Sequence, residues 1–97
     1  MSPSKTVTVM IAQEELNRMR WAARRGMLEL DLVLEPFVTM RYAQLGAADR
    51  STFQRLMQCE DQDLFAWLLQ RGDPGDEELA AIVRQILQFT RAPAEYR

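Results

Sequence analysis

The sequence predicts a small all-α protein, folded as a single five-helix bundle. Three observations indicate this fold class: apolar residues recur every three or four positions in several segments, glycine or proline stands between these segments, and the connections are short. The chain has 97 residues, of which 47% are apolar. This length is sufficient for one modest hydrophobic core and leaves no room for a second domain.

The first helix is predicted over residues 13–25. Its apolar residues follow helical spacing from Leu16 onward, two glutamates lie in the first turn and two arginines in the last, where the helix dipole favours each charge. Gly26 follows, at the position of a left-handed C-terminal cap. Residues 1–12 are expected to form a flexible N-terminal segment.

The second element has an ambiguous pattern. Residues 28–32 alternate leucine with acidic residues, which is typical of a strand. A strand here would lack a partner, because the only other β-like segment, residues 6–11, is short and terminal, and because leucine and glutamate favour helix. We therefore expect a helix over residues 27–45, bent near Pro36 and ended by Gly46.

Three further helices are predicted from apolar residues that share one helix face, over residues 49–58, 63–71 and 77–91. Gly72 is expected to close the fourth helix, and Asp76 is expected to cap the fifth, which has a wide apolar stripe. The helices form one domain over residues 13–91. Residues 92–97 are expected to form a C-terminal tail.

The composition excludes several kinds of chemistry. Because the chain has no histidine, it has no imidazole for a nucleophile pair, a metal or a proton shuttle. The single cysteine, Cys59, excludes an intramolecular disulfide and a CxxC metal site, and we expect a small buried residue rather than a reactive thiol. We therefore expect no enzyme activity and no catalytic residue.

A group of acidic residues at 60–63 raises the question of a metal site. Their spacing lacks the internal glycine and the terminal glutamate of a twelve-residue calcium loop, so helix capping is favoured. The neighbouring Phe65 and Trp67 are interpreted as core residues rather than as a cofactor site. We expect no metal and no cofactor of the protein's own.

Charge is unevenly distributed, although the net charge is only −2. Four arginines lie within residues 18–25, whereas residues 60–78 hold seven acids and one arginine. The arginine group lacks supporting lysines, so nucleic acid is not an expected partner. No apolar run is long enough to span a bilayer, and residues 1–15 have no secretory or transit pattern, so we expect a bacterial cytoplasmic protein.

The most distinctive local pattern runs from Trp21 to Asp31. Two arginines close a helix, Gly26 follows, and Glu29 stands four residues after Arg25. Helix-end electrostatics and glycine capping explain much of this pattern. A second interpretation is a binding surface, because Gly26 leaves backbone uncovered between a guanidinium and a carboxylate, where the main chain of a partner could approach closely.

Two sequence segments and their order are characteristic of one protein family. The first is WAARRGMLELDLVLEPF, and the second, some twenty residues later, is CEDQDLFAWLLQRGDP, which an amphipathic helix follows. In these the chain resembles the succinate dehydrogenase assembly factor 2 family, the small helical flavinylation factors whose bacterial members are also labelled antitoxin-like. The resemblance covers residues 17–91. The family's Arg-Gly-x-x-Glu motif falls on Arg25, Gly26 and Glu29.

The resemblance implies a non-enzymatic assembly factor that binds the flavoprotein subunit of succinate dehydrogenase and promotes covalent attachment of FAD to it. The resemblance also implies a second candidate client, the flavoprotein of the related fumarate reductase. FAD and the histidine that accepts it belong to the client. The resemblance also implies a partner-binding surface, on which Gly26 permits close approach and Arg25 and Glu29 make directional polar contacts. Its residues are Trp21, Arg24, Arg25, Gly26, Glu29 and Asp31.

A different class of function stays open at this point. An antitoxin-like regulator would use the acidic segment 60–78 to neutralise a basic toxin or to bind a membrane-associated partner. Recovery of either a flavoprotein or a small toxin in a pull-down experiment separates the two hypotheses.

Overall fold

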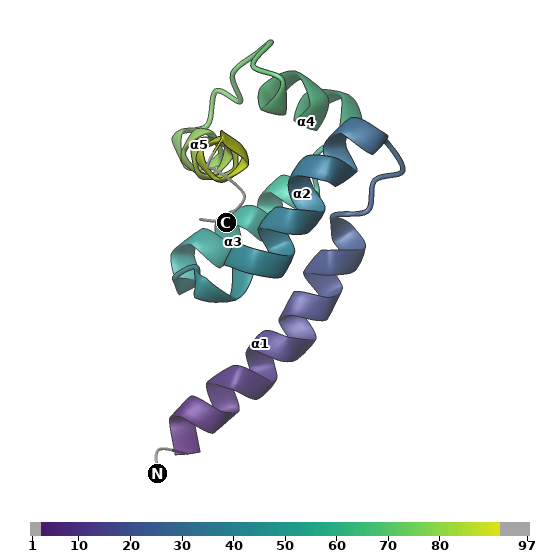
Figure 1. Cartoon of the computed structure of the whole chain (residues 1–97). Helices are drawn as coiled ribbons and strands as arrows, with labels where there is room; N and C mark the ends of the chain where they lie inside the picture. Colours follow the sequence, from purple (N-terminus) through teal and green to yellow (C-terminus); the bar gives the residue numbers. More distant parts are fainter. Residues whose placement is uncertain (1–2, 92–97) are drawn as a thin grey trace.

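The computed structural model describes the backbone of residues 3–91 and the side chains of residues 13–91. The predicted all-α, five-helix fold is confirmed in this range (Figure 1). The elements are α1 (Pro3–Ala22), α2 (Leu28–Arg41), a short 3-10 helix η1 (Tyr42–Gln44), α3 (Ala47–Met57), α4 (Asp61–Leu68) and α5 (Glu77–Arg91). The predicted tail at residues 92–97 lies outside the described residues.

Helix α1 starts earlier and ends earlier than predicted. It begins at Pro3 rather than at residue 13, so the expected irregular start is wrong for residues 3–12; proline suits the first turn of a helix, where its missing N–H costs no hydrogen bond. The amino-terminal half of α1 extends beyond the other helices (Figure 1). The expected flexibility of residues 1–12 stays a prediction. At its other end, α1 stops at Ala22, before the two arginines that were predicted to close it.

Helix α2 confirms the helical interpretation of the alternating segment. Consecutive residues of a helix are turned by about 100°, so alternate residues lie on nearly opposite faces. Leu30 is accordingly buried, whereas Leu28 and Leu32 are exposed. The helix continues through Pro36 to Arg41, and a 3-10 turn, rather than further α-helix, then leads to Gly46.

The residue that caps the C-terminus of helix α4 is not the predicted one. The left-handed position is Gln70, with a φ of 60°, and not Gly72. The N–H of Arg71 donates to the Ala66 carbonyl (2.6 Å) and the N–H of Gln70 donates to the Trp67 carbonyl (3.2 Å), which together form a Schellman motif. The prediction was wrong because it assumed that the residue with a left-handed backbone would be glycine, as is usual, whereas here it is glutamine.

Gln70→Gly is therefore expected to stabilise the protein by about 1 kcal/mol, because glycine adopts a left-handed backbone without steric cost. Urea unfolding of the two proteins measures the difference. Gln70→Ala is the control, since it keeps a Cβ at the same φ and should unfold close to the wild-type midpoint. A destabilised Gln70→Gly protein would show that the glutamine side chain matters more than its backbone conformation.

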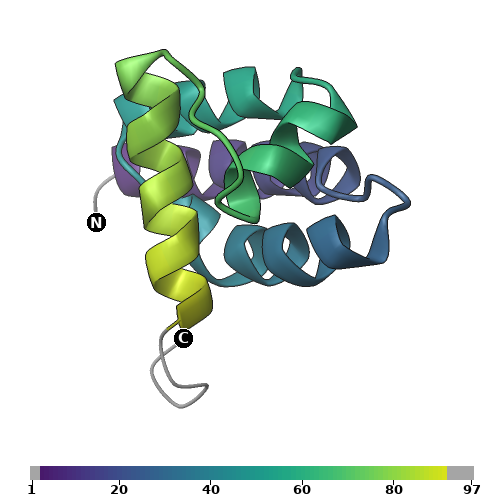
Figure 2. The same ribbon diagram turned by 90° about the horizontal axis from the view of Figure 1, so that it is seen from above.

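The core lies between α2, α3, α4 and α5, and α5 crosses the other helices (Figure 2). The ring of Phe37 in α2 stacks on that of Phe53 in α3, at 5.7 Å between centroids, and packs edge to face with that of Phe89 in α5 at 5.6 Å. The predicted core positions Phe65 and Trp67 are partly buried and pack against this cluster. Helix α2 thus buries one face completely and leaves the opposite face open.

A polar network joins α1 to the remainder of the domain. The buried Tyr42 hydroxyl donates to the Glu15 carboxylate (2.6 Å) and accepts from the Gln54 amide (2.9 Å), and the Arg50 guanidinium lies 3.0 Å from the same carboxylate. Burial raises the pKa of Tyr42 to about 12, so the hydroxyl stays protonated and keeps its donor. The network holds the carboxyl-terminal half of α1 against η1 and α3.

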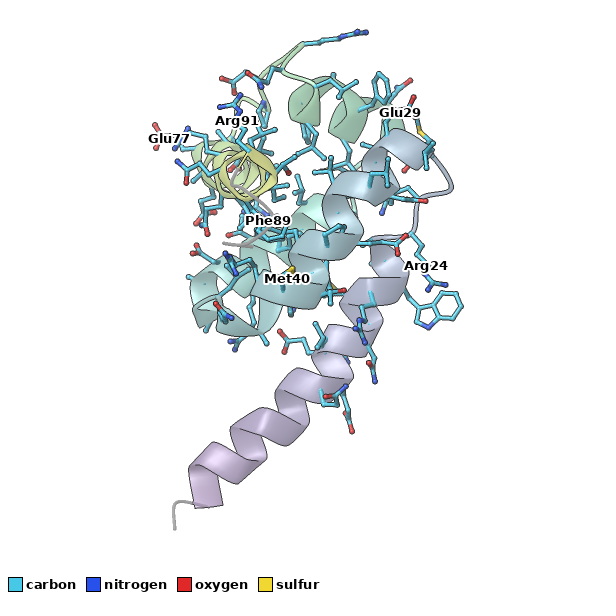
Figure 3. The ribbon with its side chains drawn as sticks, viewed as in Figure 1. Arg24, Glu29, Met40, Glu77, Phe89 and Arg91 are labelled. Carbon is cyan, nitrogen blue, oxygen red and sulfur yellow. The ribbon has the colours of Figure 1, made fainter. Side chains whose placement is uncertain are left out.

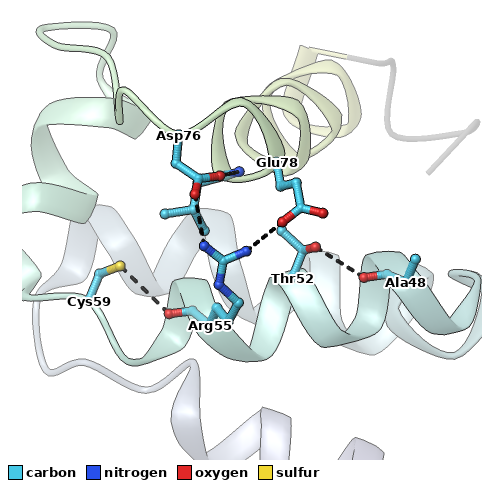
Figure 4. Close-up of polar contacts among 7 residues, drawn as sticks. Ala48, Thr52, Arg55, Cys59, Asp76 and Glu78 are labelled. Carbon is cyan, nitrogen blue, oxygen red and sulfur yellow. Dashed lines mark hydrogen bonds and ion pairs between the residues drawn. The ribbon is translucent and has the colours of Figure 1, made fainter.

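The prediction that Asp76 caps the last helix is confirmed. Its carboxylate accepts the Leu79 N–H at 3.0 Å, and it also binds Arg55 at 2.9 Å, while Arg55 binds Glu78 at 2.8 Å (Figure 4). The backbone hydrogen bond from Leu79, followed by the bond from Arg55, lowers the pKa of Asp76. The contact joins the start of α5 to the end of α3.

Asp76→Asn is expected to lower stability at pH 7 and to leave it nearly unchanged at pH 2. A carboxyl whose pKa is lowered by folding stabilises the protein above its unfolded pKa, about 3.9, and this contribution is lost as the pH falls through the folded pKa. Urea midpoints of the two proteins from pH 7 to pH 2 measure the difference. Glu77→Gln, which removes a neighbouring charge without a hydrogen bond in the described range, should show a much smaller pH-dependent difference.

Candidate functional site

Arg25 fastens the connection between α1 and α2 to the rest of the domain. Its Nε donates to the Asp61 carboxylate at 2.7 Å, its Nη1 to the carbonyls of Ala22 (3.0 Å) and Met57 (2.8 Å), and its Nη2 to the carbonyl of Cys59 (2.8 Å). The side chain is only 15% exposed. One guanidinium therefore joins the ends of α1 and α3 to the start of α4.

Asp31 holds the same connection from the opposite side. Its carboxylate accepts the backbone N–H of Arg25 at 2.8 Å, and its own N–H donates to the Met27 carbonyl at 2.9 Å in the first turn of α2. Arg25 and Asp31, both expected on a partner-binding surface, thus have extensive contacts within the molecule. The structure gives each of them a role in shaping the loop of residues 23–27.

Gly26 lies in this loop with a φ of 82°, in the left-handed region expected for it, but it does not cap α1 as predicted, because that helix ends four residues earlier, at Ala22. A Cβ at this position would meet no atom within 4 Å. The glycine is therefore required by the backbone conformation and not by crowding inside the molecule. The space above it is open to another molecule.

Exposed residues surround Gly26. Trp21 is 73% exposed, and the Arg24 guanidinium lies 5.6 Å from the centre of its ring. Glu29 is exposed and forms no hydrogen bond or ion pair with any residue of the described part of the chain. Arg24 and Glu29 project on the same side of the molecule, where α1 meets α2 (Figure 3).

Two leucines that the sequence analysis did not assign extend this surface. Leu28 is 69% and Leu32 65% exposed, and with Glu35 they share one face of α2. The Glu35 carboxylate lies 4.0 Å from Arg24, which connects this face to Trp21. The alternating sequence already indicates these exposed leucines, because a helix with leucine at every second position cannot bury all of them on one face. We call Trp21, Arg24, Gly26, Leu28, Glu29 and Leu32 the loop surface.

Two polar hollows flank the loop. One, of about 280 Å³, is lined by Asn17, Arg20 and Trp21 of α1 and by Arg24 of the loop that follows it. The other, of about 440 Å³, is lined by Met27, Glu60, Asp61, Gln62 and Phe65. The first is basic and the second is acidic, so charge changes sign across the loop.

The acidic segment of residues 60–78 is partly neutralised within the molecule. Asp61 binds Arg25, and Asp76 and Glu78 both bind Arg55. Three of the seven acids are therefore paired with arginines of the chain itself. The acidic segment on which the antitoxin-like hypothesis rests therefore has less unpaired charge than its composition suggests.

The lone thiol has no feature of a reactive site. Cys59 is partly buried, its Sγ lies 3.6 Å from the Arg55 carbonyl, and burial raises its pKa, which disfavours the thiolate. Over residues 3–91, no helix combines the length and apolar character that crossing a membrane demands.

Comparison with known proteins identifies relatives that cover most of the chain. The family model described as flavinator of succinate dehydrogenase, Sdh5, matches residues 17–90. FAD assembly factor SdhE of Pseudomonas aeruginosa is 51% identical over 78 residues, which cover 80% of this chain and 93% of that protein. The proteins of the same name from Idiomarina loihiensis and Yersinia pestis are 47% and 43% identical, over 78% and 77% of this chain and 84% and 85% of their own lengths.

Proposed function

The chain belongs to the Sdh5 family of succinate dehydrogenase flavinators, and from this we propose that it binds the succinate dehydrogenase flavoprotein subunit and promotes covalent attachment of FAD. The observation that carries the proposal is the identity of about half over most of each chain, which spans the loop surface and the segment that anchors it. We place the protein in the bacterial cytoplasm, where its one unpaired cysteine suits a reducing environment.

The proposed role is non-catalytic. The chain has no histidine, so the residue that accepts the flavin belongs to the client, and FAD is carried by the client as well. The assembly factor contributes by binding the flavoprotein in an arrangement that brings flavin and acceptor together, which removes most of the entropic cost of their meeting. The fumarate reductase flavoprotein is proposed as a second client of the same surface.

The loop surface supplies the contacts. Trp21, Leu28 and Leu32 present large apolar groups to solvent, and exposed aromatic and aliphatic anchors of this kind dominate protein interfaces. Gly26 lets the client backbone approach, and Glu29 offers a carboxylate without a partner in the described range. The remaining residues of the expected site have indirect roles, since Arg25 and Asp31 hold the loop in shape.

Covalent flavin on the client is the direct readout. The flavoprotein subunit is expressed with and without this protein in a host that lacks its own assembly factor, and intact-mass spectrometry measures the fraction that carries FAD covalently. We expect the fraction to rise strongly when the protein is present. An equal fraction in both samples would exclude the proposed function.

The double variant Leu28→Ser/Leu32→Ser is expected to weaken client binding by at least about thirtyfold. Each leucine that becomes buried in the complex contributes on the order of 1–2 kcal/mol, and both are exposed in the free protein, so folding should be unaffected. Calorimetric titration of the flavoprotein measures the Kd. Met40→Ser/Leu69→Ser, which alters two exposed apolar residues outside the loop surface, is the matched control and should bind normally.

A further inference from the structure

The basic hollow lies at the carboxyl-terminal end of α1 and has four lining residues. Asn17, Arg20 and Trp21 are spaced by three and one positions, which places them on the same side of α1, and Arg24 of the following loop completes the lining beside Trp21. All are exposed, and they enclose about 280 Å³. The hollow adjoins the loop surface, with which it shares Trp21 and Arg24.

The positive charge of this hollow is not neutralised by the part of the chain that the structure describes. Arg20 forms no hydrogen bond or ion pair with a residue of 13–91. Arg24 has only a contact of 4.0 Å with Glu35 and its position near the Trp21 ring. By contrast, the charge of Arg25 is balanced by the Asp61 carboxylate, which lies 2.7 Å from its Nε. Two guanidinium groups, one on the last turn of α1 and one on the loop after it, therefore keep most of their donors for a partner.

We propose that the hollow binds an acidic segment of the client flavoprotein, with one or two carboxylates on Arg20 and Arg24 and an apolar group against Trp21. This inference rests on the proposed function. A guanidinium matches the geometry of a carboxylate with two parallel hydrogen bonds, and a partly stacked arginine is already oriented for this contact. The amide of Asn17 at the far end supplies a donor or an acceptor for the segment's backbone.

The acidic hollow on the other side of the loop favours one orientation of the bound acidic segment. Glu60, which forms no ion pair with a residue of 13–91, lines it, so an acidic segment is attracted to Arg20 and Arg24 and repelled from the start of α4. The two hollows thus favour one orientation of the client across Gly26. Attraction on one side and repulsion on the other determine the orientation more sharply than a basic patch alone.

The test compares two double variants with the same change in net charge. Arg20→Gln/Arg24→Gln alters the hollow, and Arg84→Gln/Arg91→Gln alters two exposed arginines of α5. We expect the first to bind the flavoprotein at least tenfold more weakly than wild type at 50 mM salt and to show a shallower salt dependence, and the second to stay within twofold. Circular dichroism checks that both keep their helical content.

A crosslink identifies the chemistry of the partner. Arg20→Lys keeps the charge and adds a primary amine, which a carbodiimide couples only to a carboxylate in contact with it. Mass spectrometry of the crosslinked complex should identify a client aspartate or glutamate, and Arg84→Lys should give no such product. A Gln double variant that binds with wild-type affinity, or the lack of a client carboxylate crosslink in a complex that forms, would overturn the inference. Failure of the wild-type protein to bind the flavoprotein would instead contradict the proposed function.

Discussion

Gly26→Arg should abolish binding to the flavoprotein and covalent flavin attachment, while the helical fold persists. A non-glycine residue at a φ of 82° costs about 1–2 kcal/mol, which is less than the 5–15 kcal/mol that stabilises a typical domain. The new side chain would meet no atom within the molecule at its Cβ and would project into the space that the client backbone is proposed to occupy. Circular dichroism, calorimetric titration and the mass of the client together measure this outcome.

The chain contains a closely matched control for this substitution. Gly75 also has a φ of 82°, and a Cβ there would also meet no atom within 4 Å, but it lies between α4 and α5. Gly75→Arg should lower the melting temperature by a similar amount and bind the flavoprotein normally. If both variants lose binding equally, backbone strain and not the position of Gly26 would be the cause.

Arg25→Ala should destabilise the protein by about 3 kcal/mol, which corresponds to about 12–20 °C in Tm for a domain of this size. The substitution removes four hydrogen bonds at once and leaves the Met57 and Cys59 carbonyls and the Asp61 carboxylate without their donor. Urea unfolding measures the loss. Binding, measured at a temperature where the variant is folded, should also weaken, because the loop that presents Gly26 is no longer held.

Arg24→Ala is the control for the neighbouring position. Arg24 is exposed, and its ion pair with Glu35 is long, so the variant should unfold within about 0.5 kcal/mol of wild type. Arg25→Lys should be intermediate, since one ammonium group cannot reach all four acceptors. An Arg25→Ala protein as stable as wild type would contradict the anchoring role and favour direct contact between this guanidinium and the client.

Local patterns predicted the helices better than their ends. Asp76 and Gly26 occupy the cap and the left-handed position expected from their residue types. The end of α4 was missed, because Gln70 takes a conformation that its residue type disfavours and that the hydrogen bonds of the final turn compensate. The end of α1 was missed for a related reason: Arg25 gains more from acceptors on α3 and α4 than from a helical turn.

The residues of the candidate site also fall into those predicted from the sequence and those identified only in the structure. Trp21, Gly26 and Glu29 are predicted as site residues from the sequence, and each is exposed near the α1–α2 connection; their role in binding stays a prediction. Leu28 and Leu32 were overlooked, although the alternating pattern already implied that a helix would expose them. For Arg25 the sequence identified an important residue, but its internal contacts depend on residues more than thirty positions away.

The sequence by itself determined the helical fold class, the absence of imidazole chemistry and the motif that led to the family. These follow from periodicity, composition and short spacings, which are properties of neighbouring residues. Only the tertiary structure decided that Arg25 anchors the loop and that Gly26 is left in open space between a basic and an acidic hollow. Such facts depend on packing between distant segments, because burial and hydrogen-bond partners are fixed only when the helices come together.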